Sequence, residues 1–96
     1  MNAEQKTQRT ADFLKVVAHP LRLQILLLLT QETSLSMSTL MASLSISQPG
    51  LSMHLIKMRD KNIVVVVRKG KEMYYSVSDP ALVGILTGFL GGLCTL

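Results

Sequence analysis

The run LRLQILLLLT at residues 21–30 limits what this chain can fold into more than any other segment. Seven of its ten residues are Leu or Ile, so a helix built from it is apolar nearly all round and belongs at the centre of a core. A buried strand is the alternative, but Arg22 and Gln24 would stand unusually early in one. We therefore predict a central buried helix that begins near Pro20, a residue tolerated in a first helical turn.

Residues 4–18 have the spacing of an amphipathic helix that precedes the central one. Phe13 and Val17 lie on its apolar side, whereas its first half is polar and should be solvated. The helix should end next to Pro20, because the residue before a proline disfavours the α region. The chain therefore opens with two helices separated by a sharp break.

Two short helices joined by a tight turn should follow the central helix. A polar break with a brief strand at residues 34–36 precedes a helix over residues 38–44 and a three-residue turn over 45–47. Ser47 is a good N-cap for the next helix. That helix carries one apolar stripe at i, i+4 and i+7, formed by Leu51, Leu55 and Met58. Two helices joined in this way form a helix-turn-helix unit.

After Asn62 the pattern changes from helical to strand-like. Two segments rich in β-branched and aromatic residues follow, IVVVVR and MYYSVS, and the RKGKE between them has glycine at its tip. They predict a β-hairpin with a basic tip, and hence a mostly α winged helix-turn-helix fold. Asp79 and Pro80 then begin a last helix through Leu96, so that residues 1–96 form a single domain.

Positive charge is concentrated in residues 57–71. This span holds one acid, Asp60, and six basic residues, namely Lys57, Arg59, Lys61, Arg68, Lys69 and Lys71, whereas the net charge of the whole chain is +4. A basic face of this kind suits a polyanion such as nucleic acid. The alternative is an ordinary solvated surface.

Three ordered motifs resemble those of the ArsR/SmtB family of bacterial winged-helix repressors. The family's opening helix, Ala-x-Pro-x-Arg-x-x-Ile-Leu, is similar to AHPLRLQILLLL at residues 18–29. Its recognition motif, Leu-Ser-Gln-x-x-(Val/Leu)-Ser-x-His-Leu, resembles SISQPGLSMHL at 45–55, and its wing resembles RKGKEMYYSVS at 68–78. The resemblance covers residues 11–94. It implies a DNA-binding repressor rather than an enzyme, active on double-stranded DNA in the cytoplasm.

The resemblance also implies which residues contact DNA. Gln48 can pair with an adenine edge, and His54 is expected on the outward face, unless it only bonds the neighbouring backbone. Met53 and Gly50 depart from the family pattern; Met53 could press on a thymine methyl, and Gly50 costs about 1 kcal/mol relative to Ala. The expected DNA-contacting residues are Ser47, Gln48, Pro49, Gly50, Ser52, Met53, His54, Lys57, Arg59, Lys61, Arg68, Lys69 and Lys71.

A homodimer is expected from composition and from the resemblance. Only 17% of the residues are charged, and a subunit that hides surface in a partner would explain this low value. In the family the first and last helices pair across a two-fold axis. The residues expected at this interface are Phe13, Val17, Leu82, Leu86, Phe89 and Leu93. A GxxxG-type membrane helix is the competing interpretation of the last segment, which at residues 80–96 is short for a span of about 20 residues.

Neither a metal site nor a cofactor is expected. The stretch that matches the family's Cys-x-Cys metal cluster, residues 34–38, has no cysteine, and the last helix has neither His nor Glu. Among the branches of the family, the chain most resembles the thiol-sensing, HlyU-like and biofilm-repressor-like one, which uses two cysteines. Cys94 falls where the second is expected, but the first is replaced by Leu27. Cys94 is therefore either a redox-responsive residue or an inert thiol.

Two other functions are alternatives to a DNA-binding repressor. The first is a winged helix that docks a protein partner through the Met53 face. The second is a thiol hydrolase using Cys94 with His19 or His54, for which the sequence shows no orienting acid.

Overall fold

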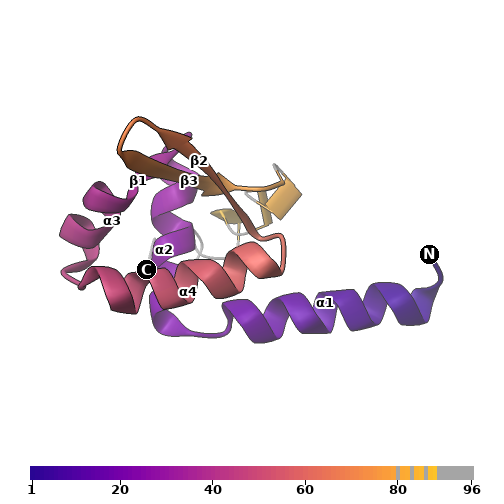
Figure 1. Cartoon of the computed structure of the whole chain (residues 1–96). Coiled ribbons are helices and arrows are strands. Elements are labelled where there is room, and N and C mark those ends of the chain that lie inside the picture. The colour runs from indigo at the N-terminus through magenta and orange to yellow at the C-terminus, as the bar shows by residue number, and fades with distance from the viewer. Residues whose placement is uncertain (80, 83, 86, 89–96) are drawn as a thin grey trace.

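A helical body carrying a small antiparallel sheet forms this structure, a computed structural model that describes residues 1–79, 81, 82, 84, 85, 87 and 88 (Figure 1). The sheet has the strand order β1-β3-β2. The elements are α1 (Ala3–Val17), α2 (Pro20–Gln31), β1 (Leu35–Ser36), α3 (Met37–Leu44), α4 (Gln48–Asp60), β2 (Val64–Lys69) and β3 (Glu72–Val77). This is the predicted winged helix-turn-helix, with α3 and α4 as the helix pair and β2 and β3 as the wing.

The observed boundaries differ from the predicted ones by about one residue, and local capping explains the two clearest shifts. α1 begins earlier than expected because Asn2 and Gln5 form a capping box, in which each side chain accepts a bond from the other's backbone N–H. α3 begins one residue earlier because the Ser36 hydroxyl caps it by accepting from the Thr39 N–H at 3.1 Å. Each cap satisfies N–H groups that a helix start leaves unpaired.

The break between α1 and α2 turns the chain through 99°. His19 stabilises the start of α2, because its Nδ1 accepts a hydrogen bond from the Leu21 N–H at 3.1 Å, and Pro20 follows at the first helical position. No single helix among the described residues is long and apolar enough to cross a membrane; only α1 and α2 together would reach that length. The bend therefore lets α2 enter the core while α1 continues outward.

The hydrophobic core surrounds α2, as its composition predicts. Ile25, Leu26 and Leu29 of α2 are fully or almost fully buried. The predicted stripe of α4 packs with them, since Leu51, Leu55 and Met58 are also buried in the same cluster. The other buried hydrophobic residues are Val17 of α1, Leu40 of α3, Ile63 just before β2, Val64 of β2 and Tyr75 of β3.

The wing is a regular antiparallel hairpin. β2 pairs with β3 from Val64 opposite Val77 to Lys69 opposite Glu72. Gly70 has a φ of +64° at the tip, a conformation that glycine adopts without steric cost. β1 pairs with the other side of β3 and so leaves β2 as an edge strand. The hairpin therefore projects its basic tip away from the core (Figure 1).

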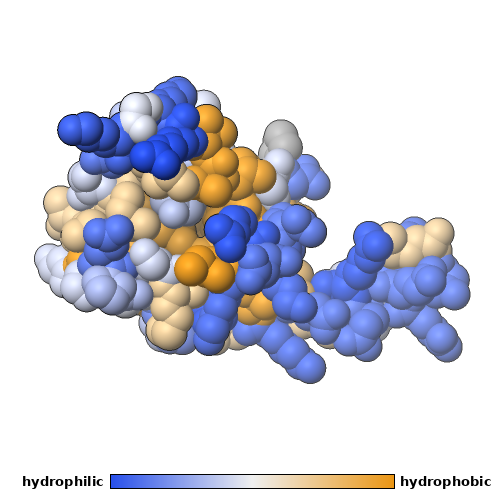
Figure 2. All heavy atoms as spheres, viewed as in Figure 1, coloured by the Kyte–Doolittle hydropathy of each residue, from blue (hydrophilic) through white to orange (hydrophobic). Residues whose placement is uncertain are grey.

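α1 extends away from the rest of the molecule (Figure 1). Residues 1–10 are all exposed, and hydrophilic side chains cover this arm in Figure 2. The helix expected after Asp79 is seen in part: residues 81, 82, 84, 85, 87 and 88 are helical, and the Asp79 carboxylate accepts from the Ala81 N–H at 2.9 Å. The remainder of that predicted helix lies outside the described residues.

Two neighbouring residues of α4 give a matched test of this packing. Leu55 is 1% exposed and Ile56 is 45% exposed. We expect Leu55→Ala to lower the free energy of unfolding by about 2–5 kcal/mol, because it removes a buried side chain and leaves a cavity. Ile56→Ala should change it by less than about 0.5 kcal/mol. Urea unfolding at one fixed protein concentration measures both, and equal losses in the two variants would contradict the observed orientation of α4.

Candidate nucleic-acid interface

α4 begins with an unusual first turn that is packed against the preceding loop. Ser47 is the N-cap by position, but its side chain makes no capping hydrogen bond, which corrects the role predicted for it. One reason is that Pro49, in the first turn, has no N–H to offer. A Cβ on Gly50 would lie only 3.3 Å from the Ile46 Cδ1. Gly50 therefore lets Ile46 pack closely over the helix start, a role that its low helix propensity alone did not indicate.

The outward side of α4 carries several of the residues predicted to contact DNA. Gln48 and Pro49 are exposed, Ser52 is half-buried and Met53 is 49% exposed. α4 lies in front of α2 in the view of Figure 1, so that its outward face is turned to solvent. Gln48, Pro49 and Met53 are thus open to solvent and Ser52 is partly so, whereas Gly50 packs against Ile46 and His54 is buried.

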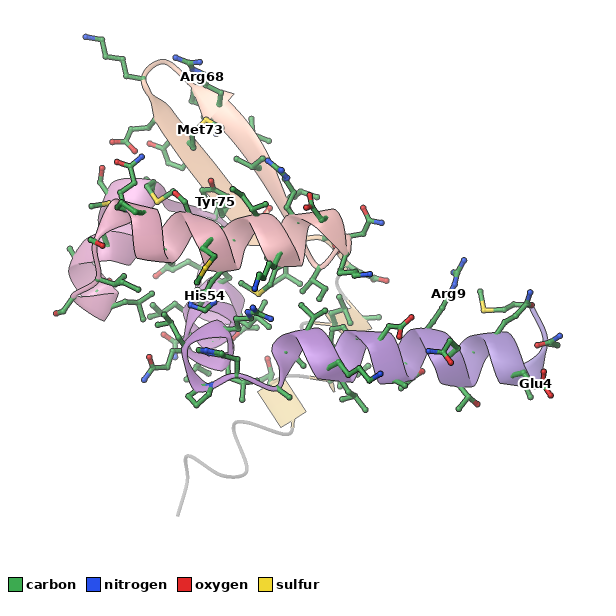
Figure 3. All side chains as sticks on the ribbon, turned by 60° about the horizontal axis from the view of Figure 1, so that its bottom comes forward. Glu4, Arg9, His54, Arg68, Met73 and Tyr75 are labelled. Carbon is green, nitrogen blue, oxygen red and sulfur yellow. The ribbon has the colours of Figure 1, made fainter. Side chains whose placement is uncertain are left out.

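His54 lies inside the molecule, so its predicted position on the outward face is wrong. It is 7% exposed, and Figure 3 shows it on the side of α4 that faces the α1–α2 corner. Its Nδ1 accepts a hydrogen bond from the Arg22 Nε at 3.1 Å. Arg22 also donates from a terminal nitrogen to the Val16 carbonyl oxygen at 2.8 Å. The two bonds join α4 to α2 and to the end of α1, so His54 positions the helix from within.

The environment of His54 favours its neutral form. Burial lowers the pKa of His54 below its ordinary value of 6.5, and electrostatic interaction with His19, Arg22 and Lys57 lowers it further. The rings of His19 and His54 lie 4.6 Å apart between centroids. The Arg22 bond requires a lone pair on Nδ1, so the proton of the neutral ring is assigned to Nε2. Protonation of Nδ1 would remove the acceptor that ties α4 to α2.

The wing presents its cations at the tip and along β2. Arg68 and Lys71 are exposed, and the Arg68 Nε donates to the Gly70 carbonyl oxygen at 3.1 Å (Figure 3). The Lys69 Nζ lies 5.3 Å from the centre of the Tyr74 ring, a cation–π contact that restrains the side chain. Below the tip, burial raises the pKa of Tyr75, whose ring packs in the core. The wing is therefore a supported strand pair rather than a loose loop.

The end of α4 adds three more exposed cations. Lys57, Arg59 and Lys61 are exposed, and Arg59 forms an ion pair with Asp60 at 3.3 Å. Since both partners are largely exposed, this pair contributes little to stability. These side chains and those of the wing form what we call the basic border of α4: Lys57, Arg59, Lys61, Arg68, Lys69 and Lys71.

The residues predicted for a dimer interface differ in how far their own subunit buries them. Val17 is 5% exposed and belongs to the core of its own subunit, so its surface is not available to a partner. Phe13 and Leu82 are half-buried. Phe13 also lines a cleft of about 410 Å³ between α1 and the end of α4, with Arg9 and Asp12 beside it. Leu86, Phe89 and Leu93 lie outside the described residues.

Cys94 lies outside the described residues. Within the described part of the chain, no three His, Cys, Asp or Glu side chains are close enough to hold a metal ion.

Comparison with known proteins identifies the family. The profile described as "Bacterial regulatory protein, arsR family" matches residues 19–66, which span α2, the helix-turn-helix unit and the start of the wing. The chain belongs to the ArsR family. It is accordingly a winged helix-turn-helix DNA-binding regulator and not an enzyme, as the three sequence motifs predicted.

Individual relatives agree with this assignment. The transcriptional repressor PagR of Bacillus anthracis is 38% identical over 76 residues, covering 79% of this chain and 76% of PagR. The nodulation protein NolR of Rhizobium meliloti is 40% identical over 76 residues, but the chain spans only 62% of its length.

Solved structures of ArsR relatives have the same fold. HlyU from Vibrio cholerae superposes with a TM-score of 0.82 at 29% identity, covering 90% of this chain and 96% of HlyU. The PagR crystal structure gives 0.80 at 34% identity, covering 90% and 98%. The expected likeness to HlyU is therefore confirmed.

Two residues of the site were missed by sequence reasoning. Arg22 was noted as an early charge in an apolar helix and as part of a family motif, but was given no role, yet it holds His54. Ile56 is exposed beside Met53, and its spacing from the core stripe of α4 was a sufficient signal to place it there.

The buried position of His54 predicts a pH dependence of stability. The unfolded chain binds a proton at His54 near its ordinary pKa of 6.5, whereas the folded chain binds it only at lower pH. Below about pH 6.5 the unfolded state therefore holds more protons, and the free energy of unfolding should fall as the pH drops through the folded pKa. In His54→Asn the amide oxygen can replace Nδ1 as acceptor, so this variant should fold but show a flatter profile. Chemical unfolding between about pH 5 and 7 measures both, and an identical slope in the two proteins would contradict the assignment.

Proposed function

We propose that this protein is a sequence-specific transcriptional repressor that binds an inverted-repeat operator in double-stranded DNA as a homodimer in the cytoplasm. The exposed outward face of α4, flanked by the basic border, carries the proposal. Helix-turn-helix proteins insert such a helix into the major groove, with its first turns against the base edges. The repressor function of PagR, similar over 79% of this chain, supports repression in particular.

Contacts to the phosphate backbone account for affinity in this proposal. The cations of the basic border are exposed on both the helix and the wing, so they can neutralise phosphates on either side of the groove. Each neutralised phosphate releases counterions, which makes binding salt-dependent. The N–H groups of Gln48 and Gly50 in the first turn of α4 have no intrahelical acceptor and suit a phosphate as well.

Contacts to the bases account for sequence preference. Gln48 is the first residue of α4 and is exposed. Its carboxamide offers one donor and one acceptor, the pair that matches the major-groove edge of adenine. Ser52 lies one turn further along the same face and can donate to either base or phosphate.

The projecting α1 supports a dimer. Residues 1–10 touch little of their own subunit, and Leu14 is 55% exposed although it is apolar. A long helix of this kind gains stability by packing against a second helix. The last helix, with Leu82 and the residues beyond it, is the proposed counterpart. A two-fold dimer would set two α4 helices about 34–36 Å apart, one turn of DNA, which requires an inverted repeat.

Two further roles stay predictions. A protein-docking winged helix would use the same α4 face, and it would be indicated by a stoichiometric partner that binds without DNA. A redox response through Cys94 requires that oxidant weaken operator binding by the parent protein but not by Cys94→Ser.

Separate variants should distinguish backbone from base contacts. After fragments bound by the intact protein are selected from the source genome, Lys69→Ala should weaken binding to all of them alike and lower the slope of log affinity against log salt by about 1. Gln48→Ala should instead lose about 1–3 kcal/mol of preference at particular base pairs. Fluorescence anisotropy at several salt concentrations measures both effects. If no fragment is bound at low salt, the DNA-binding function is wrong.

A charge on the exposed side of α1 should disrupt the dimer. Leu14→Glu places a carboxylate on an apolar position that the subunit does not bury. We expect its sedimentation to shift to that of a monomer, with a loss of operator affinity. Lys15→Gln, at the neighbouring exposed position, is the control and should stay dimeric. A parent protein that sediments as a monomer at micromolar concentration would refute the dimer.

A further inference from the structure

The outward face of α4 is apolar along the line opposite its core stripe. At about 100° per residue, Pro49, Met53 and Ile56 fall on one side of the helix, with spacing i, i+4 and i+7. Leu51, Leu55 and Met58 occupy the other side and are buried. We call Pro49, Met53 and Ile56 the outer stripe. The helix is thus apolar on two opposite faces, only one of which is used by the core.

The outer stripe is open to solvent. Met53 is 49% and Ile56 is 45% exposed, and Pro49 is exposed as well. Figure 2, which looks onto α4, shows hydrophobic side chains over its middle. A polar residue in place of Met53 or Ile56 would leave the fold unchanged, because neither side chain contributes to the buried core. Exposed apolar side chains grouped on one element indicate a surface that is covered in use.

The charge of the residues near the outer stripe indicates which kind of partner covers the stripe. The exposed cations of the basic border lie on α4 itself and on the wing. The acids beside them are Asp60, which is paired with Arg59 at 3.3 Å, and Glu72, which lies opposite Lys69 in the hairpin, so positive charge still predominates. A partner that meets these cations together with the stripe must be strongly anionic and also offer small apolar groups. Duplex DNA has both, because thymine presents a C5-methyl group in the major groove between the phosphate chains.

We propose that the outer stripe reads thymine methyl groups in the operator. The inference rests on the proposed DNA-binding function and names the bases that this site selects. Met53 and Ile56 are separated by about 4.5 Å along the helix axis, close to the rise of about 3.4 Å between successive bases of a strand. The thioether chain of Met53 is flexible and polarisable and fits an irregular apolar contact.

The neighbouring polar residue agrees with this assignment. Gln48, the first residue of the same helix, is exposed and matches the adenine edge. An A·T pair offers the adenine edge to Gln48 and a thymine methyl to the outer stripe. Half-sites rich in A·T pairs would therefore satisfy both kinds of contact at once.

The test removes single methyl groups from DNA and leaves the protein unchanged. Within a fragment that the intact protein binds, each thymine of a half-site is replaced in turn by deoxyuridine, which lacks only the C5-methyl. We expect about fourfold weaker binding at one to three positions and no change elsewhere. This factor corresponds to about 0.8 kcal/mol for one buried carbon. The same change made in both half-sites of the operator should cost about sixteenfold, since the two contacts are independent.

Protein variants then assign the contact. In Met53→Ala or Ile56→Ala the penalty for deoxyuridine should disappear at the position that the missing side chain reads, while the salt dependence stays unchanged. Val65→Ala is the matched control, because Val65 is 44% exposed but lies on the wing strand. It should retain the full fourfold penalty. Circular dichroism checks that each variant is folded.

Each outcome decides between the hypotheses. A bound fragment that tolerates deoxyuridine at every position overturns the methyl-reading role but leaves the proposed function intact. A penalty that persists in both Met53→Ala and Ile56→Ala means that other residues read the methyl groups, which also overturns it. If no fragment is bound and a protein partner is lost on Met53→Ala instead, both the proposed function and this inference are wrong.

Discussion

The burial of one stripe of α4 governs the rest of this structure. Leu51, Leu55 and Met58 are buried in the core cluster that also holds Ile25, Leu26 and Leu29 of α2, and their burial fixes the rotation of α4 about its own axis. Once that rotation is set, the opposite side must face outward, because a helix repeats every 3.6 residues. The exposure of Met53 and Ile56 therefore follows from the core and not from any contact of their own. A change in core packing would rotate the exposed face of α4, so the proposed DNA recognition would depend on the same packing as stability.

The Arg22–His54 bond adds direction to this hydrophobic contact. Apolar packing alone is non-directional, so a helix held only by Leu and Met could rotate or slide slightly. The bond of 3.1 Å between α2 and α4, together with the Arg22 bond to Val16, ties three helices at one point. A hydrogen bond with defined geometry in a partly buried site restrains the orientation of α4 more closely than the burial of apolar surface does. His54 thus affects the position of the exposed face of α4 without lying on it.

Periodicity predicted the fold well, because it reports which residues share a face. The core stripe of α4, the buried α2 and the hairpin with Gly70 at its tip were all predicted from spacing and turn chemistry. His54 was misplaced because it stands at the edge of the stripe, where spacing does not decide between core and surface. Its partner lies 32 residues earlier in the chain, and no local pattern connects the two. Val17 was assigned to a partner for a similar reason: an apolar residue at a helix end can face the core or a second subunit.

In the proposed complex with DNA, the two kinds of exposed side chain on α4 and the wing would divide affinity from selectivity. Contacts of the basic border weaken as salt rises, because they depend on counterion release. Contacts of an apolar stripe with methyl groups do not involve charge, and moderate salt leaves them unchanged. Raising the salt concentration should therefore weaken binding to all DNA, while the ratio of the affinities for thymine-containing and deoxyuridine-containing DNA stays constant. A regulator built in this way keeps its choice of site across ionic conditions, although its occupancy of that site changes.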